Sequence, residues 1–506
     1  MKRLLYVIII FCLTVLTNLD AKYTELPVEY SDARVMGMGN TFTAVADDKN
    51  MLFFNPAGFA DYGLIKTSKI DAIKDPTLWK PRYTNLGDFT FFSYTFGFDT
   101  SILEMYLGDL SPYDFVSALI SGDSITNLDG GPLKKLIDMD FFTKVADGTI
   151  TTNEARIGNS YLVQLLYTTF HPTFKAEFLS YARHYFGFGI FSSSDLRFHV
   201  EPNGLLLFNP VLQAKSDLVF PLGVGMHVPG HKRWSVGLTF KYFIRARMNI
   251  ENFNDAVAVQ QYFTGDYFTD DIDKEIESKS IWDLVFHGIA YSTTAIEQIK
   301  VGTGYGFDVG LMYRPSYAWR YGLLLSDIYT RINWWDGAEH SIIKPNLRIG
   351  AAYMPSLSLW GIFEDPVFAV DVEDLFNTQG KNFFLKWHFG TEMKFLFRIF
   401  KLRAGIQDGY PAIGLGLDLS FYFLSKIPLL KYLRPDSIYF PKFNPSDKEF
   451  LSKNPCCCCT TAFLAPLLYS HFKFDISYAA TELGVHPGEL ASYQVLFKFA
   501  YTLSYF

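Results

Sequence analysis

The sequence predicts an all-β fold, a transmembrane antiparallel β-barrel of about 14 strands with an N-terminal hatch (plug) in the lumen. Two observations predict it. Apolar and polar residues alternate over about ten residues in many segments, as in strands with one face toward lipid. The composition is 49% hydrophobic and 17% aromatic but only 19% charged, whereas soluble domains carry about 25% charged residues. Such an excess of rings is expected where many strands face lipid and end in aromatic girdles.

One closed unit fits the chain better than several soluble domains. A soluble chain of 506 residues would split into domains, yet no Pro/Gly/Ser linker or charge block divides it. The net charge is −7 and no basic stripe is visible, which argues against nucleic acid as a partner. We expect a signal peptide (1–21), a hatch (22–85) and a barrel (86–506), with long loops near 100–160, 250–300 and 421–470.

The first 21 residues have the features of a secretory signal. Lys2 and Arg3 precede an apolar stretch from Leu4 to Leu16, and Ala21 stands at the cleavage position. A transmembrane anchor is the alternative, although the run is short for a span. After Ala21 no stretch of about 18 uncharged apolar residues follows, which excludes a polytopic helical protein. The exported chain is then secreted, periplasmic or in the outer membrane, and the strand periodicity favours the outer membrane.

Six segments alternate most clearly. In 234–246 the apolar residues share one face, while Lys241, Arg245 and Arg247 lie on the other and Phe243 is the one exception. The other clear segments are 304–313, 383–397, 413–419, 472–478 and 495–505. Less regular candidates are 88–98, 160–170, 183–192, 216–228, 319–328, 346–354, 366–373 and 400–407.

The same alternation also fits a soluble sandwich, with the apolar face pointing inward. Three features favour the lipid-facing arrangement. The segments are long enough for a tilted crossing of the bilayer, rings lie at their ends, and the opposite face consists of Gly and ions of both signs. We therefore predict that Lys241, Arg245 and Arg247 face the lumen as charged side chains.

Residues 33–60 do not alternate and precede the first strand. Gly37 and Gly39 open a small-residue stretch that ends in Asp47 and Asp48 and suits a short packed helix. The run Asn55-Pro56-Ala57-Gly58 predicts a turn, with Pro56 fixing the backbone and Gly58 free to take a positive φ. The lumen of a large barrel is the available volume for this segment.

These motifs resemble a known family. The pattern small-Arg-x-x-Gly-Met-Gly, then Ala46-Asp47-Asp48, then Asn55-Pro56-Ala57-Gly58 resembles the FadL family of outer-membrane hydrophobic-compound transporters, and its spirochaete branch most of all. Three downstream segments and one strand are similar to that branch too. They are 402–405, 409–416, 482–488 and the strand 304–313. The resemblance is dense at both ends of the chain and thin between them.

The resemblance implies a 14-stranded barrel closed by an N-terminal hatch that contains the Asn-Pro-Ala turn. It implies passive uptake of long-chain fatty acids or other hydrophobic molecules, with an outer apolar groove, a deeper pocket, and release by hatch movement or a lateral opening. We also expect Asp47 and Asp48 to hold the plug to lumen cations such as Arg245 and Arg247; a solvated Asp pair is the alternative. Two other functions stay open, a protein-secretion shuttle and a surface adhesin or antigen.

No enzymatic, metal or cofactor chemistry is predicted. The sequence contains no G-x-S-x-G or H-E-x-x-H motif. Cys456, Cys457, Cys458 and Cys459 are adjacent and lack a His partner at zinc spacing, so thiol pairing or simple tolerance in a loop is the expected role. Phe506 ends an alternating segment, and a terminal aromatic of this kind is the usual recognition signal for the barrel-insertion machinery.

Overall fold

The structure is a computed structural model that describes most of the chain from Thr24 to Tyr505. The described residues are 24–28, 30, 32–62, 64–65, 80–81, 87–100, 132–166, 170–201, 209–250, 299–316, 318–337, 340–355, 358–359, 362–396, 398–420, 470–487 and 491–505. The predicted signal peptide, most of the predicted loops 250–300 and 421–470, the cysteines 456–459 and Phe506 lie outside these ranges.

The described part of the chain is mostly sheet. The long strands are β4 (Gly87–Asp99), β5 (Thr173–Arg183), β6 (Phe186–Glu201), β7 (Asn209–Val228), β8 (His231–Ile250), β9 (Lys300–Tyr313), β10 (Trp319–Trp334), β12 (Asn346–Tyr353), β14 (Phe363–Val372), β15 (Trp387–Phe395), β16 (Phe400–Gln407), β17 (Tyr410–Ser420), β18 (Ser470–Glu482) and β19 (Ala491–Tyr505). The short strands are β1 (Thr24–Glu25), β2 (Leu64–Ile65), β3 (Lys80–Pro81), β11 (Ser341–Ile343) and β13 (Ser358–Leu359).

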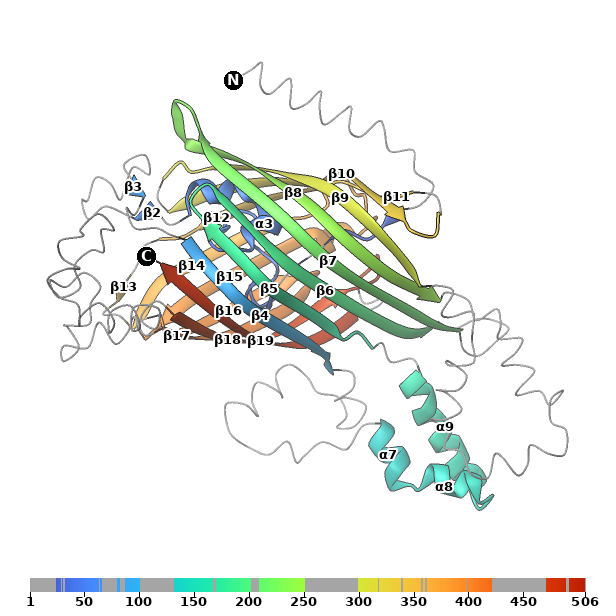
Figure 1. Ribbon diagram of the computed structural model, residues 1–506. Helices are drawn as coiled ribbons and strands as arrows, with labels where there is room; N and C mark the ends of the chain where they lie inside the picture. The colour runs from blue at the N-terminus through green and yellow to red at the C-terminus, as the bar shows by residue number, and fades with distance from the viewer. Residues whose placement is uncertain are drawn as a thin grey trace, which may run out of the picture.

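The long strands close into a 14-stranded barrel (Figure 1). Each pairs antiparallel with its neighbours, the last strand β19 pairs with the first barrel strand β4, and β9 pairs with β10, so no long strand is left as an edge. β1, β11 and β13 are short additions to this sheet, and β2 and β3 form a separate pair. A closed ladder is the only sheet that a bilayer tolerates, because it satisfies every backbone group. The predicted antiparallel barrel is confirmed.

The two ends of the barrel can be told apart by the strand ends that lie there. β4 begins and β19 finishes at one end, here called the terminal end. The opposite end, here called the loop end, carries the connection between β4 and β5, which includes the helices α7 (Pro132–Asp138), α8 (Phe141–Ala146) and α9 (Thr152–Leu166). Figure 1 shows these three helices outside the barrel wall, beyond its loop end.

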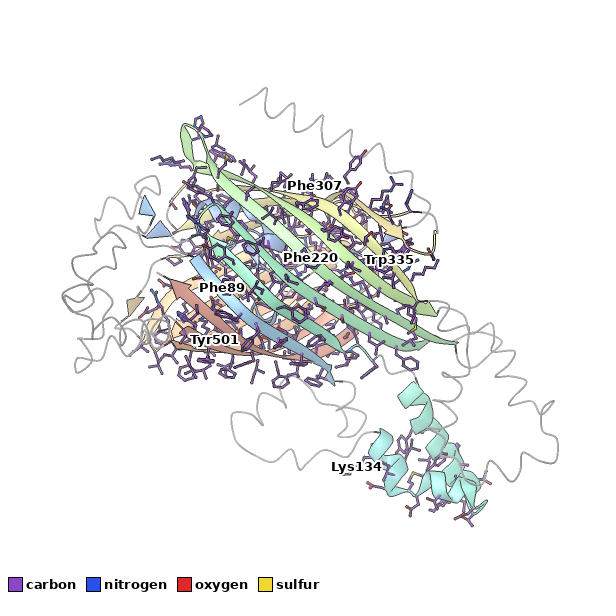
Figure 2. The ribbon with its side chains drawn as sticks, in the orientation of Figure 1. Phe89, Lys134, Phe220, Phe307, Trp335 and Tyr501 are labelled. Carbon is purple, nitrogen blue, oxygen red and sulfur yellow. The ribbon has the colours of Figure 1, made fainter. Side chains whose placement is uncertain are left out.

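The apolar rows face outward and the polar rows face the lumen. In β7, Leu222 and Met226 are 51% and 55% exposed, whereas the lumen-facing Asp217 is 1% exposed. Figure 2 shows Phe89, Phe220, Phe307 and Tyr501 on the outer surface. Phe243, the exception in the predicted pattern, is fully buried on the lumen side. A greasy outer surface around a charged interior is the arrangement of a transmembrane barrel and not of a soluble sandwich.

The wall is much taller on one side than on the other. β7 and β8 have 20 residues each, whereas β12 and β16 have eight each. At about 3.3 Å per residue and a tilt of about 40°, the eight-residue strands span about 20 Å, which is less than the apolar band of about 25 Å. The 20-residue strands span about 50 Å and extend well beyond the band.

Two predicted segments are wrong in detail. Residues 160–170 were expected as a strand, but most of them belong to helix α9, and the strand that was missed is β5 directly after them. The predicted segment 383–397 is a strand only from Trp387 to Phe395, because Phe383–Lys386 form a 3-10 helix. Among the described helices, none combines the length and the apolar character needed to cross a membrane.

Candidate functional site

Residues 32–62, here called the plug, lie inside the ring of strands. They form two short helices, α2 (Ala33–Gly37) and α3 (Met51–Phe54), and the 3-10 helix η1 (Pro56–Ala60). Asp32 caps α2 by accepting a hydrogen bond from Val35 N at 3.1 Å. Both aromatic and small plug residues are buried, among them Phe42, Phe59 and Ala44 at 0% exposure. The plug therefore fills the barrel with its own apolar core.

The Asn55-Pro56-Ala57-Gly58 turn joins the plug to the wall. Asn55 Oδ1 accepts from Ala57 N at 3.1 Å and so caps η1, and its Nδ2 donates to the carbonyl of Leu311 in β9 at 3.2 Å. Gly58 does not adopt the positive φ that was expected of it. It must be glycine for another reason, because an added Cβ would lie 2.4 Å from the carbonyl of Ala46.

Glycines on the lumen face allow the plug backbone to approach the wall. A Cβ added at Gly405 in β16 would lie 2.5 Å from the backbone nitrogen of Gly39, and one at Gly390 in β15 would lie 2.1 Å from the carbonyl of Met38. Across the barrel a Cβ at Gly237 in β8 would lie 2.2 Å from Pro56. Further glycines in contact with the plug are Gly187, Gly223, Gly225, Gly310, Gly322 and Gly414. The plug is thus seated against backbone on both sides of the lumen.

Arg34 of α2 links two carboxylates of the plug to one carboxylate of the wall. Its guanidinium pairs with Asp47 at 2.8 Å and with Asp48 at 2.7 Å inside the plug, and with Glu392 of β15 at 2.9 Å. Glu392 is fully buried and also pairs with Arg403 of β16 at 2.8 Å. Burial alone would raise the pKa of Asp47, but the charge of Arg34 outweighs it and the pKa of this carboxyl is lowered.

The predicted pairing of Asp47 and Asp48 with Arg245 and Arg247 is wrong. The two carboxylates are held by a cation of the plug itself, Arg34. Sequence separation explains the difference: Arg34 is only 13 and 14 residues away, so the local fold of the plug itself places it beside the two carboxylates.

Arg245 and Arg247 do face the lumen, where they hold the segment that precedes the plug. Arg245 is 0% exposed, pairs with Asp217 at 2.6 Å and donates to the carbonyl of Leu26 at 2.7 Å. Arg247 pairs with Glu25 and stacks over the ring of Trp334. β1, which contains Glu25, also pairs in parallel with β11 near the loop end. The chain therefore enters the lumen from the loop end.

Two further contacts fix the ends of the plug. Asp32 pairs with Lys498 of β19, and this cation outweighs the effect of burial, so the pKa of Asp32 lies below its usual range. At the other end Asp61 pairs with Arg314, in the connection from β9 to β10. Here burial dominates and raises the pKa of Asp61.

The third predicted lumen cation, Lys241, belongs to the wall and not to the plug contacts. It is 1% exposed and pairs with Asp308 of β9 at 2.9 Å and Asp327 of β10 at 2.6 Å. These groups cross-link three neighbouring strands. Within the described ranges no three His, Cys, Asp or Glu side chains are grouped to hold a metal ion.

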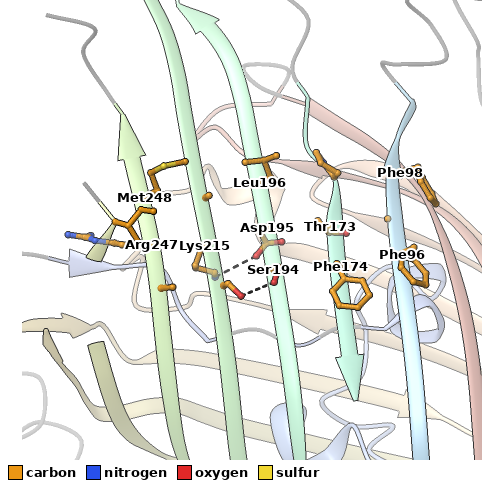
Figure 3. Close-up of a pocket in the computed structure, with 16 residues that line it drawn as sticks. Phe96, Phe98, Thr173, Phe174, Ser194, Asp195, Leu196, Lys215, Arg247 and Met248 are labelled. Atoms are coloured by element: carbon orange, nitrogen blue, oxygen red, sulfur yellow. Dashed lines mark hydrogen bonds and ion pairs between the residues drawn. The ribbon is translucent and has the colours of Figure 1, made fainter. Parts of the chain in front are cut away.

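A cavity of about 500 Å³ lies away from the plug, near the loop end on the outer face of β4 to β8, and its lining is almost wholly apolar (Figure 3). Phe96, Phe98 and Phe174 border it on one side and Met248 on the other. Small outward residues such as Ser194 lie between these borders, and Ser194 is hydrogen-bonded to Ser216 at 2.8 Å.

The smaller cavity, of about 60 Å³, lies in the lumen between the plug, the preceding segment and the wall. Its lining is mixed, with Tyr30, Phe54, Lys241 and Arg348 among its residues. The Tyr30 hydroxyl is buried without a hydrogen-bond partner among the described residues. Ligand pockets usually measure about 300–1,000 Å³, so this lumen cavity is too small for one.

Sequence reasoning missed the residues that tie the plug most firmly. Glu392 and Lys498 lie on predicted strands but were not singled out, because nothing in their own segments indicates a partner several hundred positions away. Arg34 stood inside the quoted small-Arg-x-x-Gly-Met-Gly pattern, which was the available signal. The predicted residues Gly37, Gly39 and Pro56 do lie in the plug against the wall.

No family model matches the chain, and no curated protein matches it either. Several solved structures are similar at a distance. The toluene transporter TbuX of Ralstonia pickettii has a TM-score of 0.41 at 10% identity, covering 94% of this chain and 99% of its own. The toluene transporter TodX of Pseudomonas putida has 0.37 at 10%, covering 95% and 99%.

A third solved structure, a FadL homologue of Pseudomonas aeruginosa, has a TM-score of 0.37 at 9% identity, covering 96% of this chain and 100% of its own. At these scores the likeness is distant. The fold described above rests on the strand pairings, and the site rests on the plug contacts.

Proposed function

We propose that this barrel lies in the outer membrane of a two-membraned bacterium and takes up long-chain fatty acids or other hydrophobic molecules passively. The observation that carries the proposal is a plug packed inside a closed, lipid-facing barrel whose outer wall bears an apolar cavity of about 500 Å³ near the loop end. Water-filled channels need neither feature. A route for apolar molecules needs a greasy entry site and a barrier against water and ions.

The proposed orientation follows from the connections. Outer-membrane barrels have short periplasmic turns and longer extracellular loops. At the terminal end β5 and β6 are joined by residues 184–185 and β7 and β8 by 229–230, and one long connection, 421–469, joins β17 to β18 there. The loop end carries two long connections, 100–172 with α7 to α9 and 251–299, and one short one, 408–409. We therefore assign the loop end to the cell exterior. The apolar cavity then lies on the outside, where a hydrophobic solute arrives first.

Uptake through the lumen requires the plug to move. The lumen cavity of about 60 Å³ cannot hold an acyl chain, so the described conformation is a closed one. A ligand shifts such an equilibrium only by its differential affinity for the open conformation, and a few kcal/mol are enough when the closed state is favoured modestly. The ionic contacts of Arg34 and Asp32 set that closed-state preference.

A reversible cross-link between plug and wall tests the proposal. A Cβ at Gly37 would lie 3.4 Å from the Cβ of Ser477 in β18, which is close to disulfide geometry. The double variant Gly37→Cys/Ser477→Cys, with cysteines 456–459 replaced by serine, is reconstituted in liposomes. Uptake of a radiolabelled long-chain fatty acid is expected to stop on oxidation and to return on reduction.

The matched control places the disulfide within the wall. The double variant Thr90→Cys/Thr502→Cys joins β4 to β19, because the hydroxyl oxygens of Thr90 and Thr502 lie 3.3 Å apart. Oxidation of this variant is expected to leave uptake unchanged. Equal uptake in both redox states of the plug variant would contradict movement of the plug. If the purified protein bound no fatty acid saturably, the transport function itself would fail. Co-purification of a protein partner would then favour the secretion shuttle or adhesin.

The proposal includes assembly through the C-terminal strand. β19 pairs with β18 from Ala491 to Leu503 and with β4 from Gln494 to Tyr505, so its insertion closes the barrel. We expect the barrel-insertion machinery to recognise this strand through its end at Phe506. Deleting Phe506 is expected to lower the amount of assembled barrel, measured by heat-modifiable mobility on gels.

A further inference from the structure

The connection between β14 and β15 presents two aromatic side chains to the outside. Phe383 and Phe384 of the 3-10 helix η3 (Phe383–Lys386) are 62% and 73% exposed. Phe383 contacts the ring of Trp387 at 5.9 Å, and Trp387 stacks on Phe389 at 6.2 Å. Phe383, Phe384, Trp387 and Phe389 thus form a continuous set of rings, here called the aromatic rim.

Hydrogen bonds within the connection between β14 and β15 hold these rings in their exposed position. The carboxylate of Asp374 accepts hydrogen bonds from the amide and hydroxyl of Thr378 at 2.7 and 2.8 Å. Lys386 Nζ donates to the carbonyl of Asp374 and to Asn377 Oδ1, both at 2.8 Å. Asn382 caps η3 by accepting from the amide of Phe384 at 3.1 Å. The fold therefore holds the two Phe rings outward instead of letting them turn into the lumen.

The connection is also anchored on both sides. The amide of Asn382 donates to the carbonyl of Val485 between β18 and β19 at 3.0 Å. On the other side Phe376 packs against the outward cluster of Leu325 and Ile328 of β10. A segment fixed to the outer wall in this way extends the wall's apolar surface.

The height of the aromatic rim follows from the length of β15. This strand has nine residues, which at about 3.3 Å per residue and a tilt of about 40° span about 23 Å. The apolar band of an outer-membrane barrel is about 25 Å tall. Trp387 therefore lies at the upper edge of the band, and Phe383 and Phe384 follow directly beyond it.

We propose that Phe383 and Phe384 insert into the outer leaflet at the boundary between headgroups and hydrocarbon, and that they fix the height of the short side of the barrel in the membrane. The occupant of this surface is lipid because the rings continue the lipid-facing Trp387 and Phe389 without a break. Outer-membrane barrels carry aromatic residues at this boundary, and the two Phe rings continue such a set beyond Trp387. The inference holds whatever solute the barrel carries.

Insertion of Phe383 and Phe384 would hold the short side of the wall at a fixed height in the membrane. β12 and β16 span less than the apolar band, whereas β6 to β8 extend beyond it, so the tall side keeps its wall across the band when the barrel shifts along the membrane normal. The short side has no such margin. Two inserted rings at its upper edge oppose downward and upward displacement, since either would move them out of the boundary.

The test measures the surroundings of residue 384 directly. A nitroxide label is attached at Phe384→Cys in a chain whose cysteines 456–459 are serine, and its collisions with oxygen and with a water-soluble nickel complex are compared in liposomes. Matched labels at Phe389→Cys and Asp138→Cys report lipid and water. We expect the oxygen-to-nickel ratio at 384 to lie near that at 389 and at least severalfold above that at 138.

Two outcomes would overturn the inference. A ratio at 384 equal to that at 138 would mean that the rings face water. Low collision rates with both reagents would mean that protein covers them, as in an interface between copies of this chain, and cross-linking would then reveal the copies.

A second measurement does not depend on labelling. The double variant Phe383→Ser/Phe384→Ser is expected to unfold at lower urea concentration in liposomes than the parent protein. Trp335→Ser is the control, because Trp335 is similarly exposed at 65% but follows the tall strand β10. An equal shift in both variants would show that the rim has no special relation to the membrane.

Discussion

Arg34 joins three carboxylates that belong to two different parts of the molecule. Its side chain is 12% exposed and its wall partner Glu392 is fully buried. A buried carboxylate that loses one of its cations remains in a low-dielectric site without full compensation. Loss of Arg34 is therefore costly mainly because it leaves the buried charge of Glu392 without full compensation.

We expect Arg34→Ala to destabilise the closed conformation by about 3 kcal/mol, since breaking a buried pair typically costs this much or more. In liposomes the variant should unfold at lower urea concentration and leak small ions faster than the parent. Arg398→Ala is the control, because Arg398 is 56% exposed where it pairs with Glu364, and exposed pairs contribute about 0–1 kcal/mol. Equal effects of the two substitutions would contradict the role given to Arg34.

Replacement of Gly405 should displace the plug and leave the barrel wall intact. In Gly405→Ala the new methyl group would overlap the backbone of Gly39, and backbone cannot rotate away as a side chain can. We expect the plug to be displaced, with faster protease cleavage within 32–62 and an intact barrel. Gly306→Ala is the control, because its methyl group would meet only the Thr330 side chain of the wall. Unchanged plug cleavage in Gly405→Ala would show that this contact is loose.

At the scale of the elements, the stability of the plug in the barrel depends on pH through the carboxylates of the plug. The pKa of Asp32 and that of Asp47 are both lowered in the folded protein. Groups of this kind contribute stability that is fully present above the unfolded pKa of about 3.9 and is lost as pH falls through the folded pKa. Asp61 acts in the opposite sense, because its raised pKa favours the protonated form.

The two lowered carboxylates outnumber the raised one in the plug, so we expect acid to loosen it. The thermal midpoint of the parent should be nearly constant from pH 7 to 5 and should fall below pH 4. Asp32→Asn should start from a lower midpoint and show a shallower fall. A midpoint that rises on acidification would contradict the assignment.

The strands were predictable where one face meets lipid and the other meets the lumen. β16 was predicted at its observed bounds, 400–407, because Arg403 and Gly405 alternate with apolar residues. β5 was missed because a bulge between Glu177 and Leu179 interrupts its alternation. The partners of the plug were beyond prediction for a different reason: Asp32 and Lys498 are 466 positions apart, and only the closed sheet brings them together.

At the scale of the whole molecule, the barrel wall is independent of the long connection from β4 to β5. The two strands remain paired up to Gly97 and Thr173, so their loop ends already lie side by side. Loop-end connections of barrels tolerate change well when few contacts cross them.

Replacing residues 105–168 by a short Gly/Ser linker is therefore expected to leave an assembled barrel with heat-modifiable mobility. It removes α7, α8 and α9 together. If these helices serve surface binding, the shortened protein should keep fatty acid uptake and lose only attachment to its partner. Loss of the folded barrel would instead show that the connection contributes to the wall.

The pairing of β19 with β4 has a consequence for the order of assembly. The plug precedes β4 in the chain, and β19, the strand that closes the barrel, follows all the other described strands. Asp32 of the plug pairs with Lys498 of β19. This contact can form only once β19 is in place, so the last attachment of the plug waits for the strand that closes the barrel. The seam and the plug are completed in one event.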